Sequence, residues 1–474
     1  MTTALTDYLT RLSDSITQQK PSRLSKLFNQ TSDPIQHVLR ALHSETRGKV
    51  EKNYLANVIH RRGTALGLED EWKTIVLERV WAGWMEENES WIEAYESQKL
   101  CINTYIRYIS NNPSTCTSWV LPPLYTLLRD LQTLSSNASS EHFRREATSN
   151  NNNNNNALTT TSGGDIGLYE ESTARIIQSA FKLCVSDRSN PPTLSLRKGV
   201  YKTASCLMGW YFKIDRTNLS KQLVRAVNSD PTLPKLESYK MADRVTWSYY
   251  LGLLAFRAGE DEVAGGHLGW AFERCLAGSR RNQELILKHL IPARLRLGLF
   301  PSPHLLAQYP KIERLYGKFI AAIRVGDVKA YDRALERLQS GEIAEEASTV
   351  EADADAGAGG MGMDQEMDVE VDGMGVDVGV WMALERGREV CLRGLMRGVW
   401  IACDKESRIP ISAFKLALRH QGIEVDEDEA ECLVAGMIWK GYMKGYISHE
   451  KRTVVLAKSG PFPALSKRVK PTGG

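Results

Sequence analysis

Cationic and aromatic side chains are interspersed near the C-terminal end of the sequence, a pattern typical of surfaces that bind nucleic acids. The cations are Lys440, Lys444, Lys451, Arg452, Lys458, Lys467, Arg468 and Lys470, with Tyr442, Tyr446 and Phe462 between them. Cations attract phosphates, and aromatic rings stack on bases. A solvated cationic face without a ligand explains the same residues, and both interpretations stay open.

Acidic residues nearby argue against sequence-specific contacts between this surface and bases. Asp426, Glu427, Asp428 and Glu429 begin a helix expected at 426–439. They suit the positive end of a helix dipole but repel phosphates. We therefore expect weak, salt-sensitive, sequence-nonspecific binding to a nucleic-acid backbone, with no preference for RNA or DNA decided.

A second cationic set lies in the middle of the chain. It consists of Lys213, Arg216, Lys221 and Arg225, of which the last two are four apart and share one side of a helix. Residues 171–340 hold 27 Lys and Arg against 15 Asp and Glu. This excess favours an acidic partner, although a solvated basic face is an equal alternative for each residue.

Catalytic patterns are missing from the sequence. The nine histidines are scattered, and no His-x-His with a distant Asp, the pattern of a metal isopeptidase, occurs. Gly357, Gly359 and Gly362 satisfy GxGxxG, but they lie in an acidic run that would repel a pyrophosphate. The eight cysteines form no CxxC pair and are expected to be buried thiols. We expect no enzyme activity, no metal and no cofactor.

The elements that must position these residues follow from length and composition. A chain of 474 residues, 42% hydrophobic and 25% charged, has room for about three folded units. No apolar run is long enough to span a bilayer, and the charged start MTTALTDYLTRLSDS does not resemble a secretory signal. We expect a location in the cytoplasm or the nucleus.

Composition divides the chain into six segments. We expect an N-terminal helical region (1–134), a disordered Asn/Ser/Thr-rich insertion (135–170) and a helical-repeat segment (171–340). After these we expect a disordered acidic Gly/Met-rich insertion (341–379), a winged helix (380–466) and a basic tail (467–474). The insertions contain few apolar residues to offset chain entropy.

Helical periodicity dominates the first and third segments. Apolar residues recur at three and four spacings over 68–100, where Trp72, Val80, Trp84 and Trp91 are expected in the core. In the third segment, Gly252, Ala264 and Ala271 have the offsets of the small positions of tetratricopeptide repeats. The fold predicted there is a degenerate helical solenoid.

The fifth segment changes period. Helices are expected at 381–402, 411–419 and 426–439, followed by strands at 445–448 and 454–457. Helices followed by a hairpin predict a winged helix, which binds nucleic acids or proteins. The fold class is therefore mainly α, a solenoid followed by a winged helix.

Three strings resemble a known family. ISAFKLAL (411–418), DEDEAECLVAGMIWKGYMKGYISHEKRTVVLAK (426–458) and PFPAL (461–465) are similar to the winged-helix half of a PCI domain. MADRVTWSYYLGLLAFRAGEDEVAGGHLGWAFERC and NQELILKHLIPARLRLGLFPS, upstream, resemble one branch of that superfamily. That branch holds the fungal homologues of COP nine signalosome subunit twelve and their relatives in the messenger-RNA export complex TREX two.

The resemblance implies a small winged-helix core and a scaffold role. The core positions would be Ile411, Phe414, Leu416, Ile423, Leu433, Ile438, Tyr442, Ile447 and Val455. The implied function is a non-catalytic subunit of a nuclear complex that couples transcription to messenger-RNA export. The implied partners are a larger scaffold subunit with its own PCI-like winged helix and a small acidic Sem/Dss-type protein, with RNA or DNA also open and no membrane. The alternative is an accessory structural subunit of the signalosome that acts in protein turnover without nucleic-acid contact.

Overall fold

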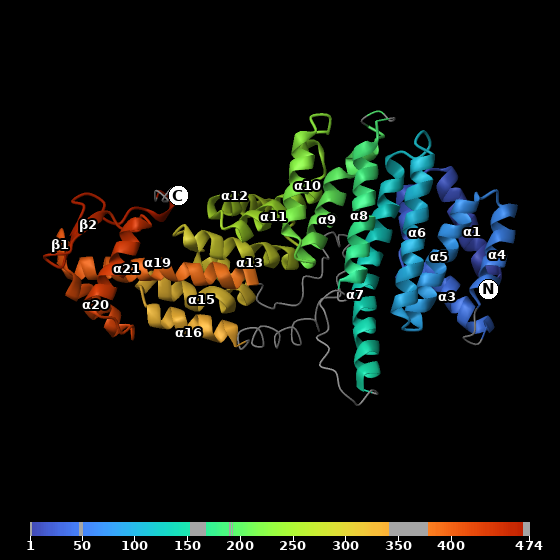
Figure 1. The fold of residues 1–474 in the computed structure, drawn as a ribbon. Helices are drawn as coiled ribbons and strands as arrows, with labels where there is room; N and C mark the ends of the chain where they lie inside the picture. The colour runs from blue at the N-terminus through green and yellow to red at the C-terminus, as the bar shows by residue number, and fades with distance from the viewer. Residues whose placement is uncertain are drawn as a thin grey trace. The chain divides into compact units, whose positions relative to one another are not determined.

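The computed structural model describes residues 2–46, 51–151, 167–188, 191, 193–340 and 378–467. The chain divides into two compact units, Met1–Trp247 and Ser248–Gly474. Helices make up most of both units, and a small sheet lies near the C-terminal end (Figure 1). None of the helices in the described ranges is long and apolar enough to cross a bilayer. The predicted fold class, a helical solenoid followed by a winged helix, is confirmed.

The first unit is a succession of helices, each packed on its neighbour in sequence. α5 packs on α6, α6 on α7, α7 on α8, and α8 on α9. The helices are α1 (Thr2–Thr17), α2 (Pro21–Phe28), α3 (Asp33–Thr46), α4 (Lys52–Ala65), α5 (Asp70–Glu87), α6 (Trp91–Asn111), α7 (Leu121–Asn151), α8 (Leu168–Ser186), α9 (Val200–Lys213) and α10 (Thr217–Ser229), with 3-10 turns η1 (Ser118–Val120), η2 (Leu196–Gly199) and η3 (Leu236–Ser238).

An aromatic cluster fills the core between α2, α5 and α6. The ring of Trp72 stacks on Phe28 with centroids 6.4 Å apart and meets Tyr105 edge-on at 5.8 Å. Trp72, Val80 and Trp84 are buried as the helical spacing predicts, whereas Trp91 is only partly buried. Such aromatic pairs add about 0.5–1.5 kcal/mol each beyond the area they bury.

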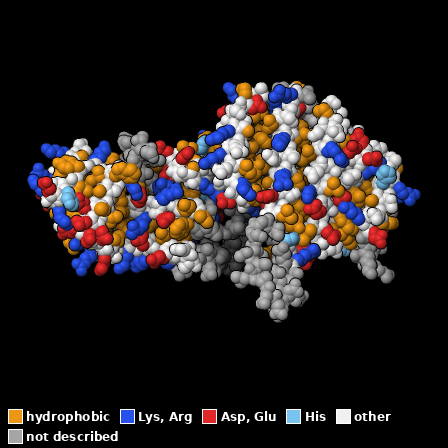
Figure 2. All heavy atoms as spheres, viewed as in Figure 1, with side chains coloured by type: hydrophobic (Ala, Val, Ile, Leu, Met, Phe, Trp, Pro, Cys, Tyr) orange, Lys and Arg blue, Asp and Glu red, His pale blue; other side chains and the backbone are white. Residues whose placement is uncertain are grey.

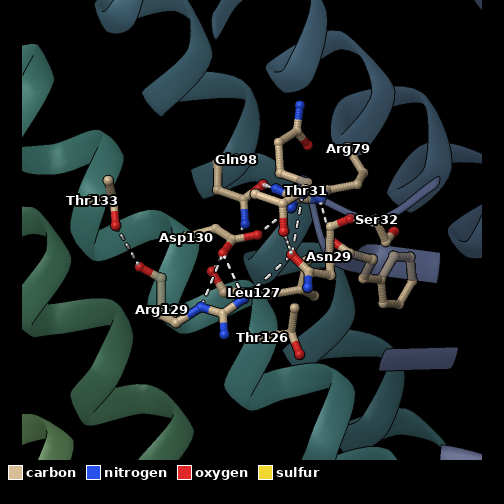
Figure 3. A network of polar contacts seen from close by, with 12 residues as sticks. Asn29, Thr31, Ser32, Arg79, Gln98, Thr126, Leu127, Arg129, Asp130 and Thr133 are labelled. Carbon is tan, nitrogen blue, oxygen red and sulfur yellow. Dashed lines mark hydrogen bonds and ion pairs between the residues drawn. The ribbon is translucent and has the colours of Figure 1, made fainter. Parts of the chain in front are cut away.

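A buried ion pair crosses the same core (Figure 3). Arg79 on α5 donates from Nε to the Phe28 carbonyl at 2.8 Å and from Nη1 to Gln98 Oε1 on α6 at 2.7 Å. Its remaining nitrogen pairs with the Asp130 carboxylate on α7. Gln98 in turn donates to the Leu127 carbonyl at 2.9 Å. One guanidinium therefore ties the end of α2 to α5, α6 and α7.

The predicted disordered insertion at 135–170 is wrong over part of its length. Helix α7 continues without a break through residues 135–151, and α8 includes residues 168–170. Residues 152–166, which hold most of the Asn-rich run, lie outside the described residues. The acidic insertion lies outside them up to residue 377, after which a helix begins.

Buried contacts explain why the serine-rich sequence stays helical. Ser135 and Ala138 are fully buried, so this stretch of α7 has a core face despite its polar composition. Ser139 donates to Glu170 Oε1 on α8 at 2.6 Å and is also within hydrogen-bond distance of the Ser135 carbonyl. Hydroxyl groups that bond to the preceding turn are satisfied inside a helix. Tertiary packing therefore overrides composition here.

The second unit opens with helix pairs and ends in the winged helix. Its elements are α11 (Met241–Ala258), which begins in the first unit, α12 (Asp261–Arg274), α13 (Arg280–Arg296), α14 (Pro303–Gln308), α15 (Pro310–Val325), α16 (Val328–Gln339), α19 (Val378–Ala402), β1 (Arg408–Pro410), α20 (Ile411–His420), α21 (Glu427–Trp439), β2 (Gly445–Ser448), β3 (Thr453–Leu456) and η4 (Leu465–Lys467). The strands at 445–448 and near 454–457 are confirmed.

Small residues let the helices of this unit cross closely. A Cβ atom on Gly252 of α11 would lie 2.6 Å from Leu268 Cγ of α12. Ala264 and Ala271 are fully buried on α12. The repeat-like offsets of these three residues thus correspond to a real close contact between helices.

Helix α19 joins the helical repeats to the winged helix. It packs against α13, α15 and α16 and also contacts α20. Arg388 on α19 holds both carboxylate oxygens of Asp332 on α16, at 2.7 and 2.8 Å. Gly326, with φ of 78°, ends α15 where a Cβ would lie 2.5 Å from the Leu395 nitrogen of α19.

The sheet of the winged helix has three antiparallel strands in the order β1-β3-β2. Val454 of β3 lies opposite Ile409 of β1 on one side and Ile447 of β2 on the other. Strand β1 was not predicted, because three residues directly before a helix are too few to establish an alternating pattern.

The predicted winged-helix core is only partly correct. Ile411, Phe414 and Tyr442 are buried, but Leu416 is 70% exposed. The remaining predicted positions, Ile423, Leu433, Ile438, Ile447 and Val455, are partly buried. The residues that fill the core in addition are Ile409, Leu418, Ala430, Val434, Met437, Met443, Val454 and Leu456.

The residues after β3 form a strap, Gly460–Ser466, which fastens the winged helix to the helical part of the unit. The Pro461 carbonyl accepts from the Lys444 N–H at 2.8 Å, and the Pro463 carbonyl accepts from Arg393 Nη2 at 2.7 Å. The side chain of Leu465 packs closely against Gly298 at the end of α13, since a Cβ atom added to Gly298 would lie 2.9 Å from Leu465 Cδ1.

Candidate functional site

Two of the predicted phosphate-binding cations already have carboxylate partners. Lys440 pairs with Glu389 of α19, which also accepts from the Tyr442 hydroxyl at 3.0 Å. Arg452 pairs with Glu427 at 2.9 Å and with Asp428 at 3.1 Å. The hydrogen bond to Glu427, with the charge of Asp428, raises the pKa of Arg452. These two cations are paired within the unit and contribute little net charge to a ligand.

The same ion pairs fix the hairpin turn against α21. Besides Arg452, His449 in the turn contacts Glu431 of α21 at 2.9 Å. The start of α21 is closed by a capping box, in which the Asp426 carboxylate accepts from the Glu429 N–H at 2.7 Å and Glu429 accepts from the Asp426 N–H at 3.0 Å. The acids that oppose phosphate binding are thus structural residues of the helix start.

Three predicted cations remain available. Lys444, Lys451 and Lys458 are exposed and have no ion pair within the described residues. The Lys444 carbonyl accepts from the Ala457 N–H at 2.9 Å, so Lys444 and Lys458 lie close together at the start of the strap. Lys451 is in the turn between β2 and β3. The side chain of Lys467, and all of Arg468 and Lys470, lie outside the described residues.

The four cations predicted for an acidic partner do not share one environment. Lys213 ends α9, donates to Ser136 Oγ at 2.5 Å and lies 4.8 Å over the Trp210 ring. Arg216 precedes α10 and pairs with Glu171 at 3.1 Å. Lys221 and Arg225 are exposed on one side of α10 and have no ion pair in the described part of the chain. Only the α10 pair is free for a partner.

The winged helix also carries exposed apolar side chains that the sequence argument placed in the core or did not consider. Leu416 on α20, Trp439 at the end of α21 and Tyr446 on β2 are 70%, 69% and 64% exposed. Hydrophobic side chains gather over the winged helix on the face seen in Figure 2. Trp439 was missed because a tryptophan at helical spacing reads as core.

Phe462 does not stand free as a stacking platform. Its ring lies 5.7 Å from the ring of Trp400 and 5.9 Å from the guanidinium carbon of Arg393, both on α19. Arg393 and Arg397 were missed by the sequence argument, because they lie more than 40 residues before the first cation of the predicted set, Lys440, and spacing along the chain does not show that the strap contacts Arg393.

No catalytic grouping emerges in the residues that the structure describes. Within them, no cluster of His, Cys, Asp and Glu could hold a metal. Burial raises the pKa of Cys101, Cys184 and Cys391 to about 12, so these thiols stay protonated and are poor nucleophiles. The glycines of the GxGxxG string lie outside the described ranges.

The comparisons with known proteins agree with this architecture. A family model described as PCI domain matches residues 387–458. The chain is 30% identical over 390 residues to Protein CSN12 homolog of Neurospora crassa, which covers 79% of this chain and 78% of that protein. It is 29% identical over 349 residues to Protein CSN12 homolog of Schizosaccharomyces pombe, 73% of each chain. It is 27% identical over 380 residues to PCI domain-containing protein 2 of Xenopus laevis, 80% of this chain and 81% of that one.

The chain belongs to the family of CSN12 homologues and PCI domain-containing protein 2. In this PCI-domain protein the match begins inside α19 and ends directly after β3. It therefore includes Arg393 and Arg397 together with Lys444 and Lys458, but not the strap. PCI-domain proteins of this kind serve as subunits of larger complexes, and the fold described above provides for that role.

Proposed function

We propose that this protein is a non-catalytic scaffold subunit of a nuclear complex that couples transcription to messenger-RNA export. The observation that carries the proposal is the joining of helical repeats to a winged helix through α19. Stacked helix pairs present a long surface to other chains, and a winged helix can contact nucleic acid or a neighbouring subunit. Both surfaces belong to one unit of this chain.

The exposed apolar residues support a protein contact on the winged helix. Leu416, Trp439 and Tyr446 are exposed, and hydrophobic side chains gather over the winged helix in Figure 2. A contiguous exposed apolar patch favours an interface. Strand β2 is an edge strand, since it pairs only with β3. A larger subunit with its own winged helix suits such a surface.

The second partner in the proposal is a small acidic protein. Lys221 and Arg225 are the free cations that suit it, on one face of α10. Changing both residues to Glu should abolish co-purification of a small acidic subunit. The matched control is Lys198→Glu with Lys235→Glu, which reverses two exposed cations of the same unit. Equal capture by the α10 variant and the parent would remove this surface from the proposal.

Weak nucleic-acid binding completes the proposal, and the exposed Lys444, Lys451 and Lys458 support it. Affinity for a labelled single-stranded RNA should fall steeply between about 50 and 200 mM salt, since each neutralised phosphate releases counterions. RNA and DNA strands of different sequence should bind within a few-fold of one another. Failure of the protein to bind either strand at about 50 mM salt would remove nucleic acid from the function.

The second candidate is an accessory structural subunit of the signalosome. The paired state of Lys440 and Arg452 favours it, since these residues stabilise the fold without offering charge to phosphates. Capture of the tagged protein's partners separates the two complexes.

A further inference from the structure

Two arginines on α19 lie on one face of the helix, and no carboxylate of the described residues lies at ion-pair distance from them. Arg393 and Arg397 are four residues apart, so their side chains are neighbours. Neither has an ion pair within the described residues. Each of the wing cations Lys440 and Arg452, by contrast, has a carboxylate at ion-pair distance.

Arg393 is held in place but is not satisfied. Its Nη2 donates to the Pro463 carbonyl at 2.7 Å, while its Nε is buried and has no hydrogen-bond partner. Burial, together with the charge of Arg397, lowers the pKa of Arg393. A partly buried guanidinium next to a second guanidinium is a place where an anion is favoured.

The nearest acid on the same face of α19 does not cancel this charge. Glu389 is one helical turn before Arg393, but its two oxygens are occupied by Lys440 and by the Tyr442 hydroxyl. The carboxylate and Lys440 are therefore already paired. Arg393 and Arg397 keep their charge for a ligand from outside the unit.

The strap brings further free cations and two rings to the arginines. Pro461 is hydrogen-bonded to Lys444, whose carbonyl accepts from the residue before Lys458. Phe462 contacts Arg393 and packs against Trp400, and both rings are partly exposed. Cations interleaved with aromatic rings are typical of surfaces for single-stranded nucleic acid.

We propose that Arg393 and Arg397, with Lys444 and Lys458 at the start of the strap, form the site for backbone phosphates of a single-stranded nucleic acid. This inference rests on the proposed function and locates its phosphate contacts on α19 and at the strand ends beside the strap, where Lys444 precedes β2 and Lys458 follows β3, away from the hairpin turn. Two arginines four apart contact two phosphates or hold one between them.

The test uses the full chain and a labelled poly(U) strand. Arg397 is exposed and makes no contact that the fold requires, so R397E should fold normally, as its melting temperature will show. Loss of one contact to a single strand lowers the salt slope by about 0.7, which at about 50 mM salt corresponds to roughly eightfold weaker binding. The conservative R397K keeps the charge and should retain most of the slope.

Arg419 provides the matched control. It is also an exposed arginine, on α20 of the same unit, with no ion pair among the described residues. R419E makes the same charge change and should leave the affinity within twofold of the parent. A loss of affinity in R397E that R419E does not share supports the site.

Four results would overturn the inference. If the parent binds and R397E binds equally well, the α19 site is wrong, while the proposed nucleic-acid binding stands on Lys444, Lys451 and Lys458. If R419E weakens binding as much as R397E, only the overall charge matters. If polyglutamate displaces poly(U) at equal charge concentration, the site takes acidic chains and not nucleic acid. A parent protein that binds no strand at low salt removes both the inference and the nucleic-acid part of the proposed function.

Discussion

Removing the Asp130 carboxylate should strongly destabilise the first unit. Its partner Arg79 is 1% exposed, while Asp130 itself is 14% exposed. D130A therefore leaves a guanidinium in the core with two neutral hydrogen-bond acceptors, the Phe28 carbonyl and Gln98, and no carboxylate at ion-pair distance; only the more distant charge of Glu86 still acts on it. Leaving a buried charge unpaired costs about 3–5 kcal/mol.

Scanning calorimetry of the full chain measures this cost. For a unit of this size, each kcal/mol lowers the melting temperature by about 2–4 °C, so D130A should lower the transition of the first unit by roughly 6–20 °C. The control is R129A. Arg129 is 39% exposed and reaches Asp130 only at 3.4 Å, so its loss should cost about 1 kcal/mol or less. If D130A melts within about 2 °C of R129A, the ion pair does not hold the four helices together as argued.

Three further changes test other parts of the fold by chemical denaturation. F414A removes a fully buried side chain and should destabilise the winged helix by about 3–5 kcal/mol. L416A, on the opposite face, should change the free energy of unfolding by less than about 0.5 kcal/mol. Equal effects of the two changes would mean that Leu416 belongs to the core, as the sequence predicted. G326A places a Cβ 2.5 Å from the Leu395 nitrogen at a φ of 78°, so it should lower the free energy of unfolding by more than the roughly 1–2 kcal/mol that a left-handed conformation alone costs. The control G266A, in open space within α12, should leave the stability unchanged or raise it slightly. If G326A is tolerated, α15 and α19 can move apart at this position. Burial raises the pKa of Glu86, so the native state binds more protons than the unfolded state near this pKa, and stability falls as pH rises through that range. E86Q should therefore be stabilised relative to the parent at neutral pH and not at pH 4, and an equal difference at both pH values would contradict this.

Helix and strand positions were predictable where local patterns are strong. The helices of the winged helix and the strand Gly445–Ser448 follow from periodicity and turn residues, and the bounds agree closely. The core face of α20 was predicted with one residue wrongly included. At helical spacing Leu416 lies beside Ser412 and His420 on the polar side of the helix, so its placement in the core followed from its residue type alone and disregarded the helical pattern.

The candidate site was harder to predict, because its contacts join residues that are far apart in the sequence. Lys440 is neutralised by Glu389, 51 residues away, and Arg393 meets the strap 70 residues later. Contacts at such separations depend on how α19 packs, which no spacing rule describes. Composition likewise misled at 135–151, because the buried face of α7 consists there of small residues such as Ser135 and Ala138.

The identity of the complex is the central claim, and partner capture tests it most directly. The full chain carries an affinity tag at the natural locus, and the proteins retained from nuclear extract are quantified by mass spectrometry with and without nuclease. The account predicts near-stoichiometric recovery of a larger subunit with its own PCI-like winged helix, a small acidic subunit and other messenger-RNA export proteins, with nuclease leaving the first two in place. Recovery of signalosome subunits in stoichiometric amounts, with no export protein above background, would contradict it.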